Sequence, residues 1–312
     1  SVSTGFQTDL VWVKYRDGTY NHTIGDSSRG TGKYIQSDTT AAEQSNVQSF
    51  TAFGSDGFTY GSELSGNQNT YPMISWSWKV NGGTTSSNSN GTITSTVQAD
   101  DDRGVSISTY TGTGSAATIG HGLGVAPKMV IVKDRGATND WAVYHAGLAT
   151  DPETDYLLLN GTAAAADDST YWNDTAPTTD VFSIGTNADV NTNTNTYVAY
   201  AFANKEGFSK FGSYEGNANA DGPFVYTGFK PRLLALKRID GLGSWLVSDS
   251  ARRPNNDGTY RELYWNSTSD EQTGADSHDG VNYFSNGFKL KATNAGANGS
   301  GNDYVYIAFA EN

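Results

Sequence analysis

The sequence predicts an all-β protein of tandem antiparallel β-sandwich, jelly-roll-like modules, and three observations carry that prediction. The first is composition: 18 Tyr, 7 Trp and 13 Phe stand against only 17% charged residues. Aromatic and β-branched residues favour strands, and aromatic side chains supply large surfaces to bury. The second is the spacing of turn signals: Asp-Gly, Asn-Gly and Gly-Asn pairs separate short apolar runs at intervals of about ten residues. The third is an internal repeat.

The repeat is marked by an apolar strand that ends in Lys, found at Asp9–Lys14, Lys128–Lys133 and Arg232–Lys237. Eight residues after each Lys stands an aromatic or imidazole ring: His22, Trp141 and Trp245. Further shared elements follow in the same order and end in an aromatic-rich closing strand: 71–78, 197–202 and 304–309. Because the order of six elements is kept, the sequence predicts three internal repeats.

The closing strands alternate with period two and carry apolar groups on both faces. We therefore expect them to be central strands that are covered on both sides. A β-propeller is disfavoured, since each unit of about 100 residues is longer than an ordinary blade.

The predicted organisation is a first repeat over 1–80, a linker over 81–103, a second repeat over 104–206 and a third over 207–312. The stretch from 81 to 90 has no apolar residue, so we expect it to be exposed and mobile. The second and third repeats begin with a leading strand, at 104–110 and 208–214, which the first repeat lacks. Either the chain is truncated there or another segment or chain fills that edge.

The charge of the chain excludes several classes of partner. Its formal net charge is −13 and its pI is about 4.6. Such a surface repels phosphate backbones and anionic lipid, which argues against nucleic-acid binding. No apolar run approaches the ~18 residues that cross a bilayer, so we expect no membrane insertion. With no cysteine, disulfides, thiolate nucleophiles and Cys-based zinc sites are absent.

Several motifs resemble the repeat modules of tail-fibre-type appendage proteins of bacteriophages and prophages, and the resemblance covers nearly the whole chain. The motifs are Gly5–Lys14, Asp26–Gly30, Asp56–Phe58, Ser75–Lys79 followed by Asn81–Gly83, Gly91–Val97, Tyr110–Gly114 and Gly120–Lys128. Two positions depart from the pattern: Thr8 replaces Pro, and Leu148 stands where the other repeats hold Arg.

The resemblance implies a virion-borne, extracellular protein that contacts other virion subunits and binds a host-surface glycan or protein. A purely structural role, as a fibre shaft or decoration, is the second hypothesis, and a polysaccharide depolymerase is the third. By analogy with fibres a homotrimer is favoured. Three tandem copies would also let a single chain mimic a threefold arrangement.

Catalytic motifs are missing, so the sequence predicts a non-enzyme without cofactor or metal. The four histidines are scattered, and no two have ligand spacing. Paired carboxylates are the only route to glycan hydrolysis that the sequence offers. The run Asp100–Asp102 suggests calcium, but calcium ligands converge from several segments, so a solvated linker is favoured.

The candidate ligand-binding residues are aromatic or cationic. Those expected on exposed polar loops are Tyr171, Trp172, Tyr260 and Tyr283. Arg29 and Arg252 each follow an Asp by three residues, a spacing that suits a clamp for an acidic sugar. The favoured alternative is a turn in which the Asp caps backbone N–H groups and pairs with the Arg. Trp141 and Trp245 follow buried strands, which favours core packing over sugar stacking.

Overall fold

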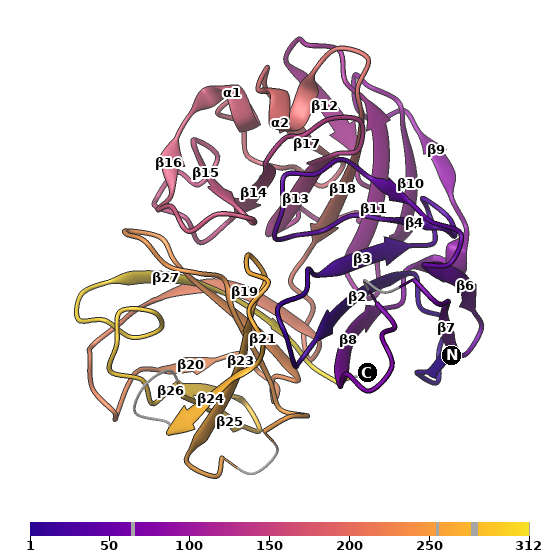
Figure 1. Ribbon diagram of the computed structural model, residues 1–312. Coiled ribbons are helices and arrows are strands. Elements are labelled where there is room, and N and C mark those ends of the chain that lie inside the picture. Colours follow the sequence, from indigo (N-terminus) through magenta and orange to yellow (C-terminus); the bar gives the residue numbers. More distant parts are fainter. Residues whose placement is uncertain (64–65, 254–255, 276–279, 312) are drawn as a thin grey trace.

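Antiparallel strands make up nearly all of the regular secondary structure, which confirms the all-β, β-sandwich class (Figure 1). The structure is a computed structural model that describes residues 1–63, 66–253, 256–275 and 280–311. Within these ranges, no helix is long and apolar enough to cross a membrane.

The elements follow the chain in order. Residues 1–80 contain β1 (Val2–Ser3), β2 (Leu10–Tyr15), β3 (Thr23–Asp26), β4 (Lys33–Tyr34), β5 (Gln44–Ser45), β6 (Phe50–Gly54), β7 (Gly57–Tyr60) and β8 (Met73–Trp78). Residues 81–206 contain η1 (Asn81–Gly83), β9 (Ser86–Asn88), β10 (Ser95–Asp100), β11 (Val105–Thr111), β12 (Ala117–Gly120), β13 (Met129–Asp134), β14 (Trp141–His145), β15 (Asp155–Leu158), β16 (Ala166–Asp167), α1 (Ser169–Trp172), β17 (Val181–Ile184), α2 (Ala188–Asn191) and β18 (Thr196–Phe202). Residues 207–311 contain β19 (Ser209–Glu215), β20 (Phe224–Tyr226), β21 (Leu233–Arg238), β22 (Leu246–Asp249), β23 (Thr259–Tyr264), β24 (Gln272–Ala275), β25 (Val281–Phe284), β26 (Gly287–Leu290) and β27 (Asp303–Phe309).

The Lys-ended strands β2, β13 and β21 have the same pairing. Each lies between the strand that follows it and the closing strand: β3 and β8, β14 and β18, β22 and β27. The registers also correspond, with Leu10 opposite Asp26 and Trp78, Met129 opposite His145 and Phe202, and Leu233 opposite Asp249 and Phe309. We use these registers to define equivalent positions. The repeat boundaries stay a prediction.

Period-two alternation sends the two faces of each Lys-ended strand into different cores. One face packs against a small sheet of its own repeat: β1-β7-β6, β12-β17 or β20-β26-β25. In β2, for example, Val11 and Val13 pack with Phe50 and Phe58. The other face, represented by Leu10, enters a central core that draws residues from all three predicted repeats.

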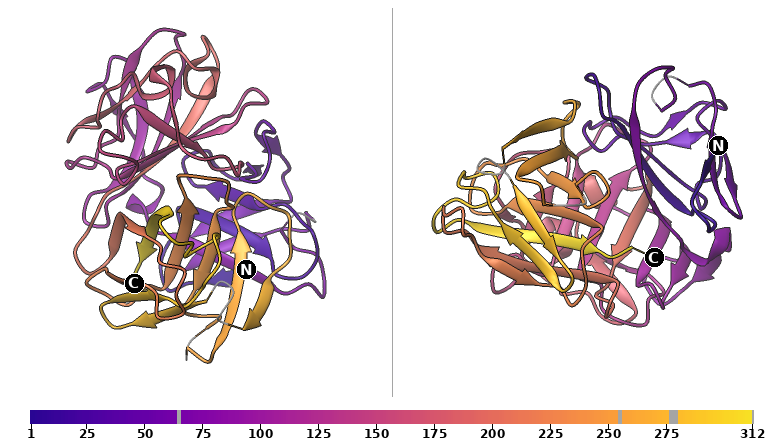
Figure 2. Two further views of the ribbon diagram at one scale, coloured as in Figure 1. Left: turned by 90° about the vertical axis from the view of Figure 1, so that its left-hand side faces the viewer. Right: turned by 90° about the horizontal axis from the view of Figure 1, so that it is seen from below.

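Three equivalent aromatic residues meet inside this central core. The ring centroids of Trp78 and Phe309 are 5.6 Å apart, those of Phe202 and Phe309 5.7 Å, and those of Trp78 and Phe202 6.3 Å. Two further views show the three parts of the chain beside one another (Figure 2). One interior is therefore shared by all three predicted repeats.

Buried lysines join the repeats in a closed ring. The Nζ of Lys14 donates to the carbonyl of Thr268 at 3.3 Å, that of Lys133 to Thr40 at 3.2 Å, and that of Lys237 to Ala163 at 2.8 Å. Among the predicted repeats, the first thus contacts the third, the second contacts the first, and the third contacts the second. Burial lowers the pKa of each of these lysines to about 8. They therefore remain mostly charged at neutral pH while their ammonium groups bind carbonyls.

Two buried histidines add contacts between repeats. The Nδ1 of His22 accepts from the Trp12 indole at 2.8 Å, and its Nε2 bonds the Tyr264 carbonyl at 2.8 Å. The Nδ1 of His145 accepts from the backbone N–H of Gly147 at 3.0 Å, and its Nε2 bonds the Tyr306 carbonyl at 3.2 Å. Because one ring nitrogen accepts and the other donates, both imidazoles must be neutral.

We expect stability to fall as the pH drops below about 6.5. Burial lowers the pKa of His22 to about 3 and that of His145 to about 4. The unfolded chain therefore binds more protons between pH 6.5 and those values. Once the shifts are fully expressed, His22 costs about 5 kcal/mol and His145 about 3 kcal/mol. Urea titrations at pH 7, 5.5 and 4.5 measure this loss. The variant His145→Gln should show a shallower pH dependence, and an unchanged slope would contradict the assignment.

The predicted linker over 81–103 is a part of a sheet. Residues 81–90 are largely exposed, as expected, but β9 and β10 form the outer strands of the eight-stranded sheet that contains β13. In β10, Val97 is 4% exposed and Gln98 is fully buried. The Gln98 side-chain oxygen Oε1 accepts from the hydroxyls of Ser27 and Ser28 at 3.0 and 2.8 Å, which ties this segment to the first predicted repeat.

Candidate functional site

The expectation of exposed aromatics at Tyr171, Trp172 and Tyr283 is wrong. These side chains are 5%, 2% and 4% exposed. Tyr171 and Trp172 lie in the short helix α1, where Tyr171 stacks on Tyr156 at 3.7 Å and donates to the Asp189 carboxylate at 2.6 Å. Their polar neighbours in the sequence suggested exposure, but the helix turns the rings of Tyr171 and Trp172 inward. Tyr260, on β23, is partly exposed.

The Asp–Arg pairs form the turns that the sequence favoured. The Asp26 carboxylate accepts from the backbone N–H of Arg29 at 2.8 Å and from its guanidinium at 2.5 Å. Asp249 and Arg252 repeat this arrangement at 2.9 and 2.6 Å. Arg29 is 5% exposed, so the clamp hypothesis is wrong for that residue. The Arg252 side chain is also only 5% exposed.

The Arg29 turn connects two repeats. Besides Asp26, its guanidinium bonds Glu43 at 3.0 Å and the hydroxyl of Tyr200 at 3.2 Å. That hydroxyl in turn donates to Asp26 at 2.7 Å. Desolvation opposes the charge of Arg29, but the carboxylates around it hold its pKa above the ordinary value. The arrangement is structural, since the buried cation is already satisfied by partners within the chain.

An exposed aromatic patch lies one residue away from a predicted site. On β25, Tyr283 points inward, so its neighbour Phe284 points outward and is 40% exposed. Phe224 and Tyr226 on β20 are 47% and 63% exposed. The rings of Phe224 and Phe284 lie 5.9 Å apart at 69°. We call Phe224, Tyr226 and Phe284 the aromatic patch; it occupies the outer face of the β20-β26-β25 sheet.

The fold does not require aromatic residues at these positions. The inward-facing residue of β20 is Val225, opposite Phe288, and it is equivalent to Ile119, opposite Phe182, and to Val2, opposite Phe58. Its outward neighbours are Phe224 and Tyr226 only in the third repeat. At the equivalent positions the second repeat has Thr118 and Gly120, and the first has Ser1 and Ser3. The patch is therefore an addition to a shared scaffold.

Polar groups border the aromatic patch. Lys289 lies opposite both Phe224 and Asn282 in the strand ladder, and its ammonium group contacts the Asp221 carboxylate. This hydrogen bond from Lys289 lowers the pKa of Asp221. Exposed rings that lie beside an amide and a charged pair offer an apolar surface together with hydrogen-bonding groups. That combination suits the C–H face and the hydroxyls of a sugar.

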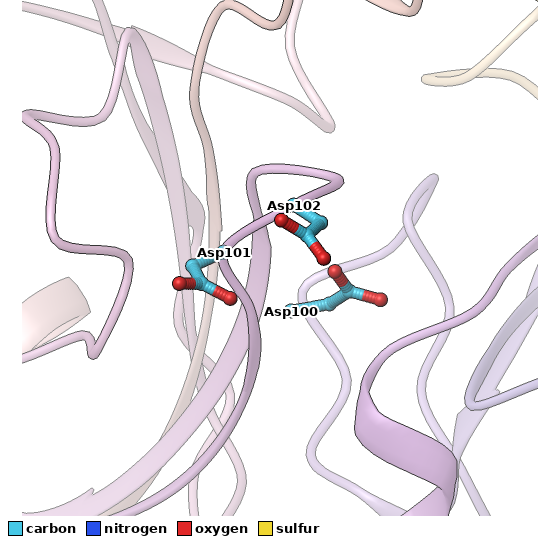
Figure 3. A group of neighbouring side chains, drawn as sticks. All are labelled: Asp100, Asp101 and Asp102. Atoms are coloured by element: carbon cyan, nitrogen blue, oxygen red, sulfur yellow. The ribbon is translucent and has the colours of Figure 1, made fainter.

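The acidic run Asp100–Asp102 lies in the turn between β10 and β11 (Figure 3). One oxygen from each carboxylate lies within 4.8 Å of the others. Asp100 already accepts from the backbone N–H of Arg103 at 2.9 Å and pairs with its guanidinium at 3.1 Å. This partner compensates one of the three charges, and the other two carboxylates are exposed, as expected of a solvated run.

The fold and the patch define an all-β protein of antiparallel sandwich sheets that carries an exposed aromatic surface on one of them. Residues 1–312 match the model of a family described as a domain of unknown function, DUF7483, and the chain belongs to that family. No curated protein and no solved structure matches the chain.

Proposed function

We propose that this protein is a phage appendage protein whose aromatic patch binds a glycan on the host surface. The observation that carries the proposal is the exposure of Phe224 and Tyr226, beside Phe284, at positions where the strands equivalent to β20 carry small residues. Exposed aromatic groups that the fold does not need favour a role in binding. The appendage role rests on the sequence resemblance.

The chemistry of the patch favours sugar over nucleic acid. The net charge of −13 opposes phosphate backbones, while neutral sugar rings meet no such barrier. Tyr226 combines an apolar ring with a hydroxyl, and Asn282 and Lys289 supply donors at the margin. A sugar ring resting on the patch would therefore meet both a stacking surface and hydrogen-bonding groups.

A structural role in the virion is the second candidate, and the ring of buried lysines favours it. Contacts that link each repeat to another in cyclic order give a rigid body suited to stacking in a filament or to decorating a particle. Such a role needs no exposed aromatic residues.

Replacing Tyr226 with Ser should weaken glycan binding about tenfold or more, because it removes a stacking ring at little cost to the fold. The measurement is binding of the labelled protein to an array of bacterial surface glycans, followed by titration of the best ligand. The matched control is Leu242→Ser, which removes an apolar side chain that is 76% exposed elsewhere in the third repeat. Equal binding by Tyr226→Ser and the parent, or no array signal from the parent, would contradict glycan recognition and favour the structural role.

A further inference from the structure

Three polar side chains from distant parts of the chain meet beside the start of β2. Asp9 immediately precedes β2, Ser27 immediately follows β3, and Gln98 lies in β10. The Asp9 and Gln98 side chains are fully buried. The backbone N–H of Ser27 donates to the carbonyl of Asp9 at 2.8 Å, so these two residues extend the pairing of β2 with β3 by one step. Their positions are therefore fixed by the sheet.

The hydroxyl of Ser27 lies between a base and an acyl group. Its Oγ is 2.9 Å from Oδ1 of Asp9 and 3.0 Å from Oε1 of Gln98. One hydroxyl has one proton, so it cannot donate to both oxygens, and a carboxylate forms the stronger hydrogen bond. Donation to Asp9 leaves the oxygen of Ser27 against the carboxamide of Gln98. Within the described residues, the other donor to Oδ1 is the Gln7 amide, at a longer 3.4 Å.

The remaining contacts of this network suit acyl transfer. Oε1 of Gln98 also accepts from the hydroxyl of Ser28 at 2.8 Å, which places a donor where negative charge would develop. The Nε2 amide of Gln98 donates to the carbonyl of Val80. Oδ2 of Asp9 accepts from the backbone N–H of Val80 at 2.6 Å, which holds the carboxylate with Oδ1 toward Ser27. A nucleophile, a base, an acyl group and an oxyanion donor are thus in contact.

The fold does not require these side chains at these positions. The same backbone bond occurs in the other two predicted repeats, from Ala146 to Lys128 at 2.8 Å and from Ser250 to Arg232 at 2.9 Å. The acceptor residue carries a cationic side chain in both cases, so neither repeat pairs a carboxylate with a hydroxyl. The network is therefore an addition to a shared scaffold, which favours a chemical role.

We propose that Ser27 and Gln98 form an intramolecular ester that cross-links β10 to the turn after β3. Asp9 takes the proton from Oγ of Ser27, and an electron pair of that oxygen forms the bond to Cδ of Gln98. The π electron pair of the carbonyl moves to Oε1, where the hydroxyl of Ser28 stabilises the charge. When that pair returns, the Cδ–Nε2 bond breaks. The nitrogen keeps the electrons of that bond, takes the proton from Asp9 and leaves as ammonia.

Burial protects the ester once it has formed. Ammonia escapes into solvent, so the reverse reaction loses its nucleophile, and the fully buried side chain of Gln98 keeps water away from the carbonyl. The cross-link closes a loop from 27 to 98 and restricts the unfolded chain, as a disulfide does. It gives a chain without cysteine a covalent brace, and it involves none of the residues of the aromatic patch.

The mass of the intact protein tests the proposal. The purified chain, kept at neutral pH until its mass is constant, is expected to be lighter than its sequence by one ammonia. After digestion, the peptides that contain Ser27 and Gln98 should be recovered as one species, which hydroxylamine separates because it cleaves esters. The full mass of the sequence would overturn the proposal. So would the small gain in mass that accompanies hydrolysis of Gln98 to Glu.

Three variants assign the roles. Ser27→Ala should keep the full mass of its sequence, and its fold should be intact because the second predicted repeat has Ala146 at this position. Ser28→Ala loses the oxyanion donor, so its ester should form about a hundredfold more slowly, measured as the cross-linked fraction at equal times after synthesis.

The matched control is Ser95→Ala, which removes another buried hydroxyl of β10, bonded to the carbonyl of Gly120 at 2.9 Å. This variant should lose ammonia as the parent does. A cross-link that persists in Ser27→Ala, an unchanged rate in Ser28→Ala or a missing cross-link in Ser95→Ala would each overturn the proposed reaction.

Discussion

Replacing Phe202 with Ala is expected to lower the free energy of unfolding by about 3 to 5 kcal/mol. The ring is 6% exposed and touches Trp78, Phe211 and Phe309, which come from three different strands of the central core. Truncation removes apolar contacts and leaves a cavity whose walls belong to three rigid sheets, so collapse around it is limited. Urea denaturation followed by tryptophan fluorescence measures the loss.

The same experiment tests whether the central core makes the three predicted repeats one cooperative unit. Because all three contribute to that core, we expect a single transition for both the parent and Phe202→Ala. Tyr226→Ala, at an exposed position, should change stability by no more than about 0.5 kcal/mol. Separate transitions, or a loss below about 1 kcal/mol in Phe202→Ala, would show that the repeats are only loosely joined.

Replacing Arg29 with Leu should cost about 3 to 5 kcal/mol. The Arg29 and Asp26 side chains are both fully buried, and the substitution would leave the Asp26 carboxylate without its cation. It would also remove one of the two arginines that pair with Glu43, of which Arg135 remains at 2.9 Å. Substitution of the other partner, Asp26→His, should also lower the free energy of unfolding, because it would leave the Arg29 guanidinium without its closest carboxylate.

The chain itself provides the compensating pair. At the equivalent positions the second repeat has His145 and Leu148, which are both fully buried. The double variant Asp26→His with Arg29→Leu should therefore lose at least about 1 kcal/mol less than the sum of the two single losses. A double-mutant cycle from urea titrations at pH 7.5 measures this coupling, at a pH where a buried His is neutral. Strict additivity would mean that the ion pair is not the source of the cost.

Much of the fold could be predicted from local pattern. Alternation in the closing strands predicted central strands with two apolar faces, which β18 and β27 are. The Asp–Arg spacing predicted a turn capped by Asp26 and Asp249. These features depend on neighbours along the chain, because side-chain direction has period two and capping bonds span three residues.

The candidate binding residues could not be predicted in the same way. Polar neighbours suggested that Tyr171, Trp172 and Tyr283 were exposed, yet all three are buried. A shift of one residue along a strand exchanges the buried and exposed faces, so Phe284 is exposed where Tyr283 was expected. Polar neighbours indicate that an aromatic residue lies near a surface loop, but they do not indicate which way its ring points.

The sequence by itself determined the strand class and the recurring order of the elements. Only the tertiary structure decided that Leu10, Met129 and Leu233 meet in one central core and that the lysines close a ring. The reason is physical: a strand's own pattern defines two faces, whereas the partner of each face is set by segments far away in the chain.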